Sequence, residues 1–204
     1  MTNTIIKGEL SAGKKVLVMI HGRGASAEDI LSISTHLSVS EFTLLAPQAP
    51  GHTWYPNSFM APQVQNEPYL SQALTGLGEI INTLNAKAIP DKDIYFLGFS
   101  QGACLALEFV CRNARKWGGL VAFTGGLIGD VLNLKNYQGN FEGTSVYIGS
   151  SDPDPHVPVT RVEETQKVLV SMNAKVEVDI FDHMGHTVND AEIKKANKLL
   201  SGSI

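Results

Sequence analysis

The stretch IYFLGFSQGACLALEF (residues 94–109) decides how the rest of the chain is interpreted. Its first six residues are apolar and rich in aromatic and β-branched side chains, as in a buried strand. After the turn GFSQG (98–102) the chain becomes apolar again with small residues, as in a helix that packs on a sheet. This turn fits the pattern G-x-S-x-G, in which a sharp strand-to-helix turn exposes a nucleophilic serine, here Ser100. The pattern is weak alone, so the remaining chain has to supply the groups that such a serine needs.

Strand-like and helix-like segments alternate along the whole sequence. Six short segments are rich in β-branched or aromatic residues and are bounded by turn formers: 15–22, 42–48, 93–99, 118–126, 144–150 and 175–182. Amphipathic segments typical of helices lie between and after them: 26–38, 68–87, 101–116, 158–172 and 189–200. Because most of the strands are apolar on both faces, we expect a mostly parallel sheet with helices on both sides. No linker or repeat interrupts the pattern, which predicts one α/β domain over 1–204.

The last predicted strand, KVEVDIFD (175–182), differs from the others because charged and apolar residues alternate along it. Alternation of this kind is typical of a strand with one face in water. We therefore expect this strand near an edge of the sheet.

Composition argues mildly against several classes of partner. The 204 residues carry 16 Lys and Arg against 20 Asp and Glu, and the net charge of −4 argues against nucleic acid or an anionic membrane as a partner. No stretch reaches the roughly 18 apolar residues of a membrane span, and the first residues do not form a secretory signal. Cys104 and Cys111 would lie about 10 Å apart on one helix, too far for a disulfide. We therefore expect reduced cysteines in a cytoplasmic protein.

Polar residues follow four of the predicted strands. In an open parallel sheet, sites form where the loops converge at the carboxyl ends of the strands. These ends carry His21 to Gly24, then Ser100, then Asp152 and Asp154, and finally His183 and His186. A serine hydroxyl becomes a good nucleophile when a histidine removes its proton and a carboxylate fixes the tautomer of that histidine. The order Ser, Asp, His along the chain is the one expected for this type of fold.

Four motifs make the resemblance to a known family specific. HGRG (21–24), GFSQGA (98–103), DPHVP (154–158) and MGHTV (184–188) resemble the phospholipase/carboxylesterase family of small α/β-hydrolases, which includes acyl-protein thioesterases. The likeness runs over nearly the whole chain. It implies an α/β-hydrolase fold and a serine esterase without a cofactor or a metal. By the motifs, Ser100 matches the nucleophile, Asp154 the acid and His186 the general base.

Two of these assignments have competitors nearby in the sequence. Asp152 lies two residues before Asp154, and either carboxylate could orient a histidine. The family pattern favours Asp154, and Asp152 would then be a turn residue. His183 competes with His186, which the Gly-His pair favours. We interpret His156 as part of the turn beside the acid.

The oxyanion that forms during ester hydrolysis needs hydrogen-bond donors. One donor should be the backbone N–H of Gln101, which follows the nucleophile at the N-terminus of a helix. The resemblance points to the N–H of Arg23 as the other. Acyl-protein thioesterases tend to have leucine at position 23, so an arginine leaves the acyl pocket in question. We hypothesise that Arg23 favours substrates with an anionic group; the alternative is a solvated surface arginine.

Two connections bear on the substrate. The segment 127–143 has fewer than twenty residues, which is too short for a cap domain, so we expect an open site. The loop 49–63 is dense in aromatic residues and proline, and could form a wall that buries an acyl or aromatic group. In the family a tryptophan of this loop borders the site, which makes Trp54 a candidate substrate-binding residue. The alternative is a loop that packs on the body of the protein or on a second copy, which leaves a homodimer open.

These observations predict a serine carboxylesterase that hydrolyses short- to medium-chain esters, small molecules, through an acyl-enzyme. The same triad would serve an acyl-protein thioesterase or a lysophospholipase, which is the alternative within this class. A metallohydrolase built on Asp152, Asp154, His156, His183 and His186 is a second class, but it leaves the glycine–serine turn unexplained. A non-catalytic binding protein is a third class, and it would have no use for a complete Ser-His-Asp set.

Overall fold

A seven-stranded sheet forms the centre of the structure, a computed structural model that describes residues 3–202. The strands lie in the order β1-β3-β2-β4-β5-β6-β7, and only β1 is antiparallel to its neighbour. Their bounds are β1 (Thr4–Lys7), β2 (Lys15–Ile20), β3 (Phe42–Pro47), β4 (Ile94–Phe99), β5 (Gly119–Phe123), β6 (Ser145–Asp152) and β7 (Lys175–Asp182). This arrangement is the mostly parallel α/β-hydrolase sheet that the sequence predicts.

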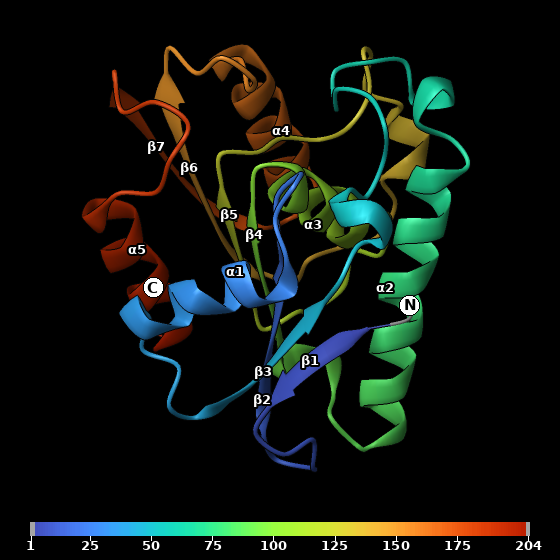
Figure 1. The fold of residues 1–204 in the computed structure, drawn as a ribbon, viewed down its shortest axis with the longest axis vertical. Coiled ribbons are helices and arrows are strands. Elements are labelled where there is room, and N and C mark those ends of the chain that lie inside the picture. The colour runs from blue at the N-terminus through green and yellow to red at the C-terminus, as the bar shows by residue number, and fades with distance from the viewer. Residues whose placement is uncertain (1–2, 203–204) are drawn as a thin grey trace.

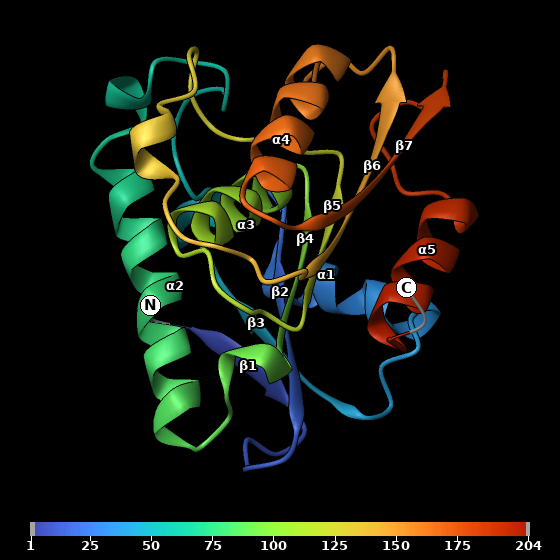
Figure 2. The same ribbon diagram turned by 180° about the vertical axis from the view of Figure 1, so that it is seen from behind.

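Helices cover both faces of the sheet (Figures 1 and 2). One face packs against α2 (Tyr69–Ala86), α3 (Gln101–Arg112) and α4 (Val159–Ser171), and the other against α1 (Ala27–Ser32) and α5 (Asp190–Leu200). Side chains of β2 alternate between the two cores: Val16, Val18 and Ile20 face α2 to α4, whereas Leu17 and Met19 face α1 and α5. Burial on both faces explains why the central strands are continuously apolar.

Two sequence predictions differ from the structure at the beginning of the chain. The short antiparallel strand β1 was not predicted, because four residues on a half-exposed edge carry almost no pattern. The helix expected over 26–38 ends at Ser32 and continues only as a 3-10 turn over Ile33–His36. The hydroxyls of Ser34 and Thr35 donate to the carbonyls of Leu31 and Ser32, and this local bonding competes with a regular helix.

The connections agree with an open molecule. Strand β7 lies at the edge of the sheet, as its alternating sequence predicts. Between β5 and β6 the chain forms only the 3-10 turn Leu134–Asn136, so no cap domain covers the carboxyl ends of the strands. Within residues 3–202, no helix is both long and apolar enough to cross a membrane. Cys104 and Cys111 are buried and unpaired, as expected.

Helix α5 begins with a capping box that places a carboxyl group in the core. The Asn189 side chain accepts from the N–H of Glu192, and Glu192 Oε2 accepts from the N–H of Asn189 at 2.8 Å. The Glu192 side chain lies against Gly149 of β6, where a Cβ would be 2.1 Å from its Oε1. Burial raises the pKa of Glu192 from 4.5 to about 7, because the N–H of Asn189 compensates only in part and Asp179 adds repulsion.

The raised pKa of Glu192 predicts a pH dependence of stability. Between pH 4.5 and 7 the folded state binds more protons at this carboxyl than the unfolded chain does, so the free energy of unfolding falls as the pH rises through this window. The contribution is up to about 3 kcal/mol. Urea denaturation of Glu192→Gln at several pH values should therefore show a shallower decline from pH 5 to 8 than the wild type. The matched control is Glu28→Gln, which removes an exposed carboxylate from the first turn of α1 and should keep the wild-type decline; equal slopes in all three proteins would contradict the prediction.

Candidate active site

Ser100 stands on a strained turn between β4 and α3. Its backbone has φ 53° and ψ −120°, a conformation that L-residues rarely adopt. The turn is possible because α3 begins almost in contact with the sheet. A Cβ on Gly102 would lie 2.0 Å from the carbonyl oxygen of Ile20, and one on Gly98 would lie 2.5 Å from that of Gly102. Only glycine fits at these two positions, which is the physical reason for the G-x-S-x-G pattern.

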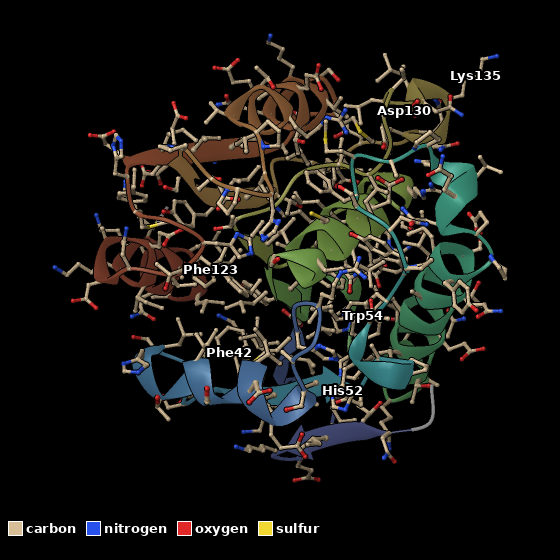
Figure 3. The ribbon with its side chains drawn as sticks, turned by 45° about the horizontal axis from the view of Figure 1, so that its top comes forward. Phe42, His52, Trp54, Phe123, Asp130 and Lys135 are labelled. Carbon is tan, nitrogen blue, oxygen red and sulfur yellow. The ribbon has the colours of Figure 1, made fainter. Side chains whose placement is uncertain are left out.

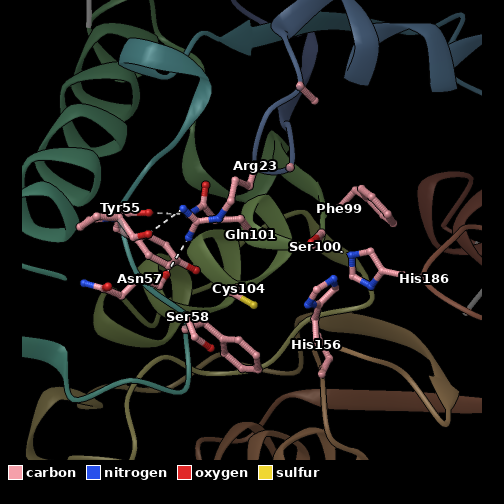
Figure 4. A pocket seen from close by; sticks show the side chains of 15 residues that line it. Arg23, Tyr55, Asn57, Ser58, Phe99, Ser100, Gln101, Cys104, His156 and His186 are labelled. Atoms are coloured by element: carbon pink, nitrogen blue, oxygen red, sulfur yellow. Dashed lines mark hydrogen bonds between the residues drawn. The ribbon is translucent and has the colours of Figure 1, made fainter. Parts of the chain in front are cut away.

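His186 reaches Ser100 from the loop after β7. Its Nε2 lies 2.8 Å from the Ser100 Oγ, within hydrogen-bond distance. The imidazole is held from two sides, by the ring of Phe99 at 5.2 Å and by that of His156 at 4.9 Å between centroids. In Figure 4 the rings of His186 and His156 lie on one side of Ser100, and the side chains of Tyr55, Asn57 and Ser58 lie on the other. The sequence predicts only that His156 belongs to the turn beside Asp154. In the structure its ring also lines the pocket at Ser100.

Asp154 completes a chain of hydrogen bonds. Its Oδ2 lies 2.9 Å from His186 Nδ1, and its Oδ1 accepts from the N–H groups of His156 and Val157 at 2.8 and 2.9 Å. The side chain is fully buried. Burial by itself raises the pKa of this carboxyl, but the hydrogen bonds from His156, His186 and Val157 outweigh it and leave the pKa below its usual value. Asp154 is therefore an ionised acceptor that orients the imidazole with Nδ1 as the donor.

The two competitors lie away from this chain of contacts. Asp152 ends β6 with an exposed side chain, and its contact to the loop is through its carbonyl oxygen, which accepts from the N–H of His183. The His183 ring is exposed and pairs with Asp182 at 2.6 Å. The geometry brings together Ser100, His186 and Asp154, the three residues that the motifs single out.

Two residues of the pocket that holds Ser100 have a backbone N–H that is free within residues 3–202. Gln101 begins α3, so its N–H has no partner within the helix. Arg23 lies in the loop after β2, and in the described part of the chain neither its N–H nor that of Gln101 donates a hydrogen bond to another protein group. Both residues line the same pocket as Ser100 (Figure 4). Free donors beside a nucleophile have the chemistry of an oxyanion hole.

His21 supports the loop that carries Arg23. The ring is fully buried, its Nε2 accepts from the N–H of Ala49, and its Nδ1 lies 2.7 Å from the carbonyl oxygen of Gly22. Burial lowers the pKa of His21, which keeps the imidazole neutral with the proton on Nδ1. His21 is therefore a structural residue that ties this loop to the end of β3.

A cavity of about 570 Å³ opens at Ser100. This volume is within the ordinary range for small-molecule sites. Aromatic side chains, histidines and short polar groups share its wall: Gly22, Arg23, Ala25, Tyr55, Pro56, Asn57, Ser58, Phe59, Phe99, Ser100, Gln101, Cys104, His156, Val157 and His186. Cys104 lines it as a buried thiol whose pKa burial raises to about 12, so it is not a nucleophile at neutral pH.

The aromatic loop lines this cavity, although not through the residue that the sequence singles out. Trp54 is only 3% exposed and does not line the cavity. Its indole N–H donates to the carbonyl oxygen of His21 at 2.8 Å, and Figure 3 shows Trp54 beside the loop that follows β2. Tyr55 and Phe59 form the wall instead. The aromatic composition predicts such a wall, but which ring turns inward depends on the loop backbone, which has no sequence signal.

The Arg23 guanidinium is neither free in solvent nor directed at the serine. Nη1 donates to Thr53 Oγ1 at 3.1 Å and to the Pro56 carbonyl at 2.8 Å, and Nη2 donates to the Asn57 carbonyl at 2.6 Å. The side chain thus connects the loop after β2 with the cavity wall. A preference for anionic substrates stays a prediction.

Comparison with known proteins identifies the family. The model of the phospholipase/carboxylesterase family matches residues 1–204. The chain belongs to the phospholipase/carboxylesterase family. A solved phospholipase/carboxylesterase from Dyadobacter fermentans shares 48% identity with this family member, covering 97% of this chain and 95% of its own, with a TM-score of 0.95. A search of curated proteins finds no match.

More distant structures share the fold. A carboxylesterase from Bacillus cereus has a TM-score of 0.80 at 21% identity, covering 98% of this chain and 94% of its own. SOBER1 from Arabidopsis thaliana has a TM-score of 0.78 at 18% identity, covering 93% and 99%. Family members of this kind are carboxylesterases, which are serine hydrolases, and this chain is therefore a hydrolase.

The two aspartates after β6 provide a matched pair of variants. Asp154→Asn keeps the shape but cannot hold the Nδ1–H tautomer of His186, and kcat on a nitrophenyl ester should fall by about 10⁴-fold. Asp152→Asn changes an exposed carboxylate and should leave kcat within about twofold. Steady-state kinetics on both folded variants check the assignment. A large loss of kcat in Asp152→Asn together with a nearly unchanged kcat in Asp154→Asn would show that Asp152 orients the histidine instead.

Proposed function

We propose that this family member is a carboxylesterase that hydrolyses short- to medium-chain carboxylic esters of small molecules through an acyl-enzyme on Ser100. The observation that carries the proposal is the unbroken chain from Ser100 Oγ to His186 Nε2 at 2.8 Å and from His186 Nδ1 to Asp154 Oδ2 at 2.9 Å. An open cavity of about 570 Å³ with Tyr55 and Phe59 in its wall supports an ester of modest size.

Acylation would begin with attack of the Ser100 Oγ on the ester carbonyl carbon. His186 Nε2 takes the hydroxyl proton, and Asp154 stabilises the imidazolium that forms. The carbonyl oxygen acquires a negative charge, which the N–H groups of Arg23 and Gln101 stabilise. His186 then gives its proton to the alkoxide as the carbon–oxygen bond breaks, the alcohol leaves, and the acyl group remains on Ser100.

Deacylation repeats these steps with water. His186 takes a proton from water as the hydroxide attacks the acyl carbon, a second oxyanion forms in the same place, and its collapse releases the carboxylic acid. The proton returns to Ser100 Oγ. Every step uses the chain's own side chains and N–H groups.

The compartment is part of the same proposal. We assign the protein to the cytoplasm because its two cysteines are unpaired and buried, as is usual for proteins of reducing compartments.

Removal of the nucleophile tests the proposal. Ser100→Ala should lower kcat/KM on nitrophenyl butyrate by at least about 10⁴-fold, since no other nucleophile would form the acyl-enzyme. The control is Ser32→Ala, an exposed serine at the end of α1, which should keep full activity. A panel of esters from acetate to decanoate, with one acyl-thioester, measures the chain-length preference. Activity that survives in Ser100→Ala, or that prolonged EDTA treatment abolishes in the wild type, would contradict the proposal.

A further inference from the structure

Arg23 and Gln101, whose backbone N–H groups are free within the described chain, both bind the segment 53–57 with their side chains. The Arg23 guanidinium donates to the carbonyls of Pro56 and Asn57. The Gln101 side chain donates from Nε2 to the Tyr55 carbonyl at 2.8 Å and accepts at Oε1 from the N–H of Trp54 at 3.0 Å. Figure 4 shows the side chains of Arg23 and Gln101 together beside Tyr55 and Asn57.

Thr53 lies between these two side chains. Its Oγ1 accepts from Arg23 Nη1 at 3.1 Å, and two acceptors lie within reach of its own proton, the Tyr55 carbonyl at 3.0 Å and Gln101 Oε1 at 3.3 Å. The hydroxyl has one proton, and its shorter contact is the one to the Tyr55 carbonyl, which also accepts from Gln101 Nε2 at 2.8 Å. Thr53 therefore binds the Arg23 guanidinium directly, and it is linked to the Gln101 side chain either through the Tyr55 carbonyl that both bind or through Oε1.

The two N–H groups differ in how well their backbone is fixed. The N–H of Gln101 is held by the start of α3, a helix that is buried from Gln101 to Cys111 and packs on the sheet. Arg23 lies between Gly22 and Gly24, and Gly24 has φ 77°. A loop with two glycines has many accessible backbone conformations, so the direction of the Arg23 N–H needs support from outside the loop. The hydrogen bond from the Gly24 N–H to the His52 carbonyl, at 2.7 Å, supplies one such support from the same neighbouring segment.

We propose that Thr53 is a positioning residue that sets the distance between the N–H groups of Arg23 and Gln101, and thereby preorganises the oxyanion hole. This inference rests on the proposed esterase function. Donors stabilise an oxyanion well only when they are aimed before the charge forms, and an error of about 1 Å in position can cost up to about 100-fold in rate. Thr53 touches neither the serine nor the histidine, so it acts through Arg23 and Gln101.

Thr53→Val and Thr53→Ser separate the hydroxyl from the shape of the side chain. Thr53→Val should lower kcat about tenfold with KM within about twofold, because both acylation and deacylation pass through an oxyanion. Thr53→Ser restores the hydroxyl and should return kcat to within about threefold of the wild type. The inhibition constant of butylboronic acid, which forms a tetrahedral adduct, should rise in Thr53→Val by the factor by which kcat/KM falls. Thr83→Val, the same change on the exposed face of α2, is the control.

A second variant covers the case in which Thr53→Val folds poorly. Arg23→Met keeps the backbone N–H and most of the stem but removes the guanidinium, and it should also lower kcat with little change in KM. Because both changes break the same bridge, the double variant should lose much less than the product of the single losses. Thermal unfolding of each variant shows whether the fold is intact.

The outcomes separate this inference from the proposed function. An inactive Ser100→Ala together with a wild-type kcat in Thr53→Val, or a rise in KM alone, would overturn the role of Thr53 and leave the esterase standing. If kcat of the Thr53→Val, Arg23→Met double variant falls by the product of the two single losses, the two side chains act independently and the proposed bridge is wrong. Full activity in Ser100→Ala would overturn both proposals.

Discussion

The site depends on one close backbone contact, between the start of α3 and the end of β2. At Gly102 the helix comes so near that an added Cβ would lie 2.0 Å from the Ile20 carbonyl. This contact bends the chain sharply after β4 and places Ser100 at the top of the turn with φ 53°. It also brings the N-terminus of α3 beside the loop that follows β2. The proposed nucleophile and the proposed oxyanion donors therefore depend on the same packing constraint.

The site also depends on the charge states of two buried side chains, Asp154 and His21. Asp154 is buried, yet three hydrogen-bond donors keep its pKa low, so a negative charge persists where the His186 imidazole needs an acceptor. His21 is also buried, and burial lowers its pKa, so the ring stays neutral and its Nε2 accepts from the N–H of Ala49. His21 and His186 follow different strands of the same sheet, and they differ in role because their partners differ.

The sequence predicts the parts of this structure that have a period or a motif. Strands β2 to β7 and the five helices have clear patterns, and Ser100, Asp154 and His186 follow strand ends in a family motif. Strand β1 is too short and exposed to have a pattern. The choice of Tyr55 over Trp54 for the cavity wall depends on loop conformation, which neither periodicity nor motif encodes.

The hydrogen bonds around Thr53 show the same limit more sharply. The sequence predicts roles only for the backbone N–H groups of Gln101 and Arg23. Nothing in it indicates that their side chains meet around Thr53, which is 30 residues from Arg23 and 48 residues from Gln101 along the chain. Such a contact depends on side-chain rotamers and on the path of an irregular loop. It becomes visible only when the loop is placed on the sheet.

A crystal structure of the protein after reaction with an alkyl fluorophosphonate would test the account most directly. The account predicts one adduct, a phosphorus bonded to Ser100 Oγ, with the phosphoryl oxygen about 3 Å from the backbone nitrogens of both Arg23 and Gln101. An adduct on another residue, or a phosphoryl oxygen that points away from both N–H groups, would contradict it.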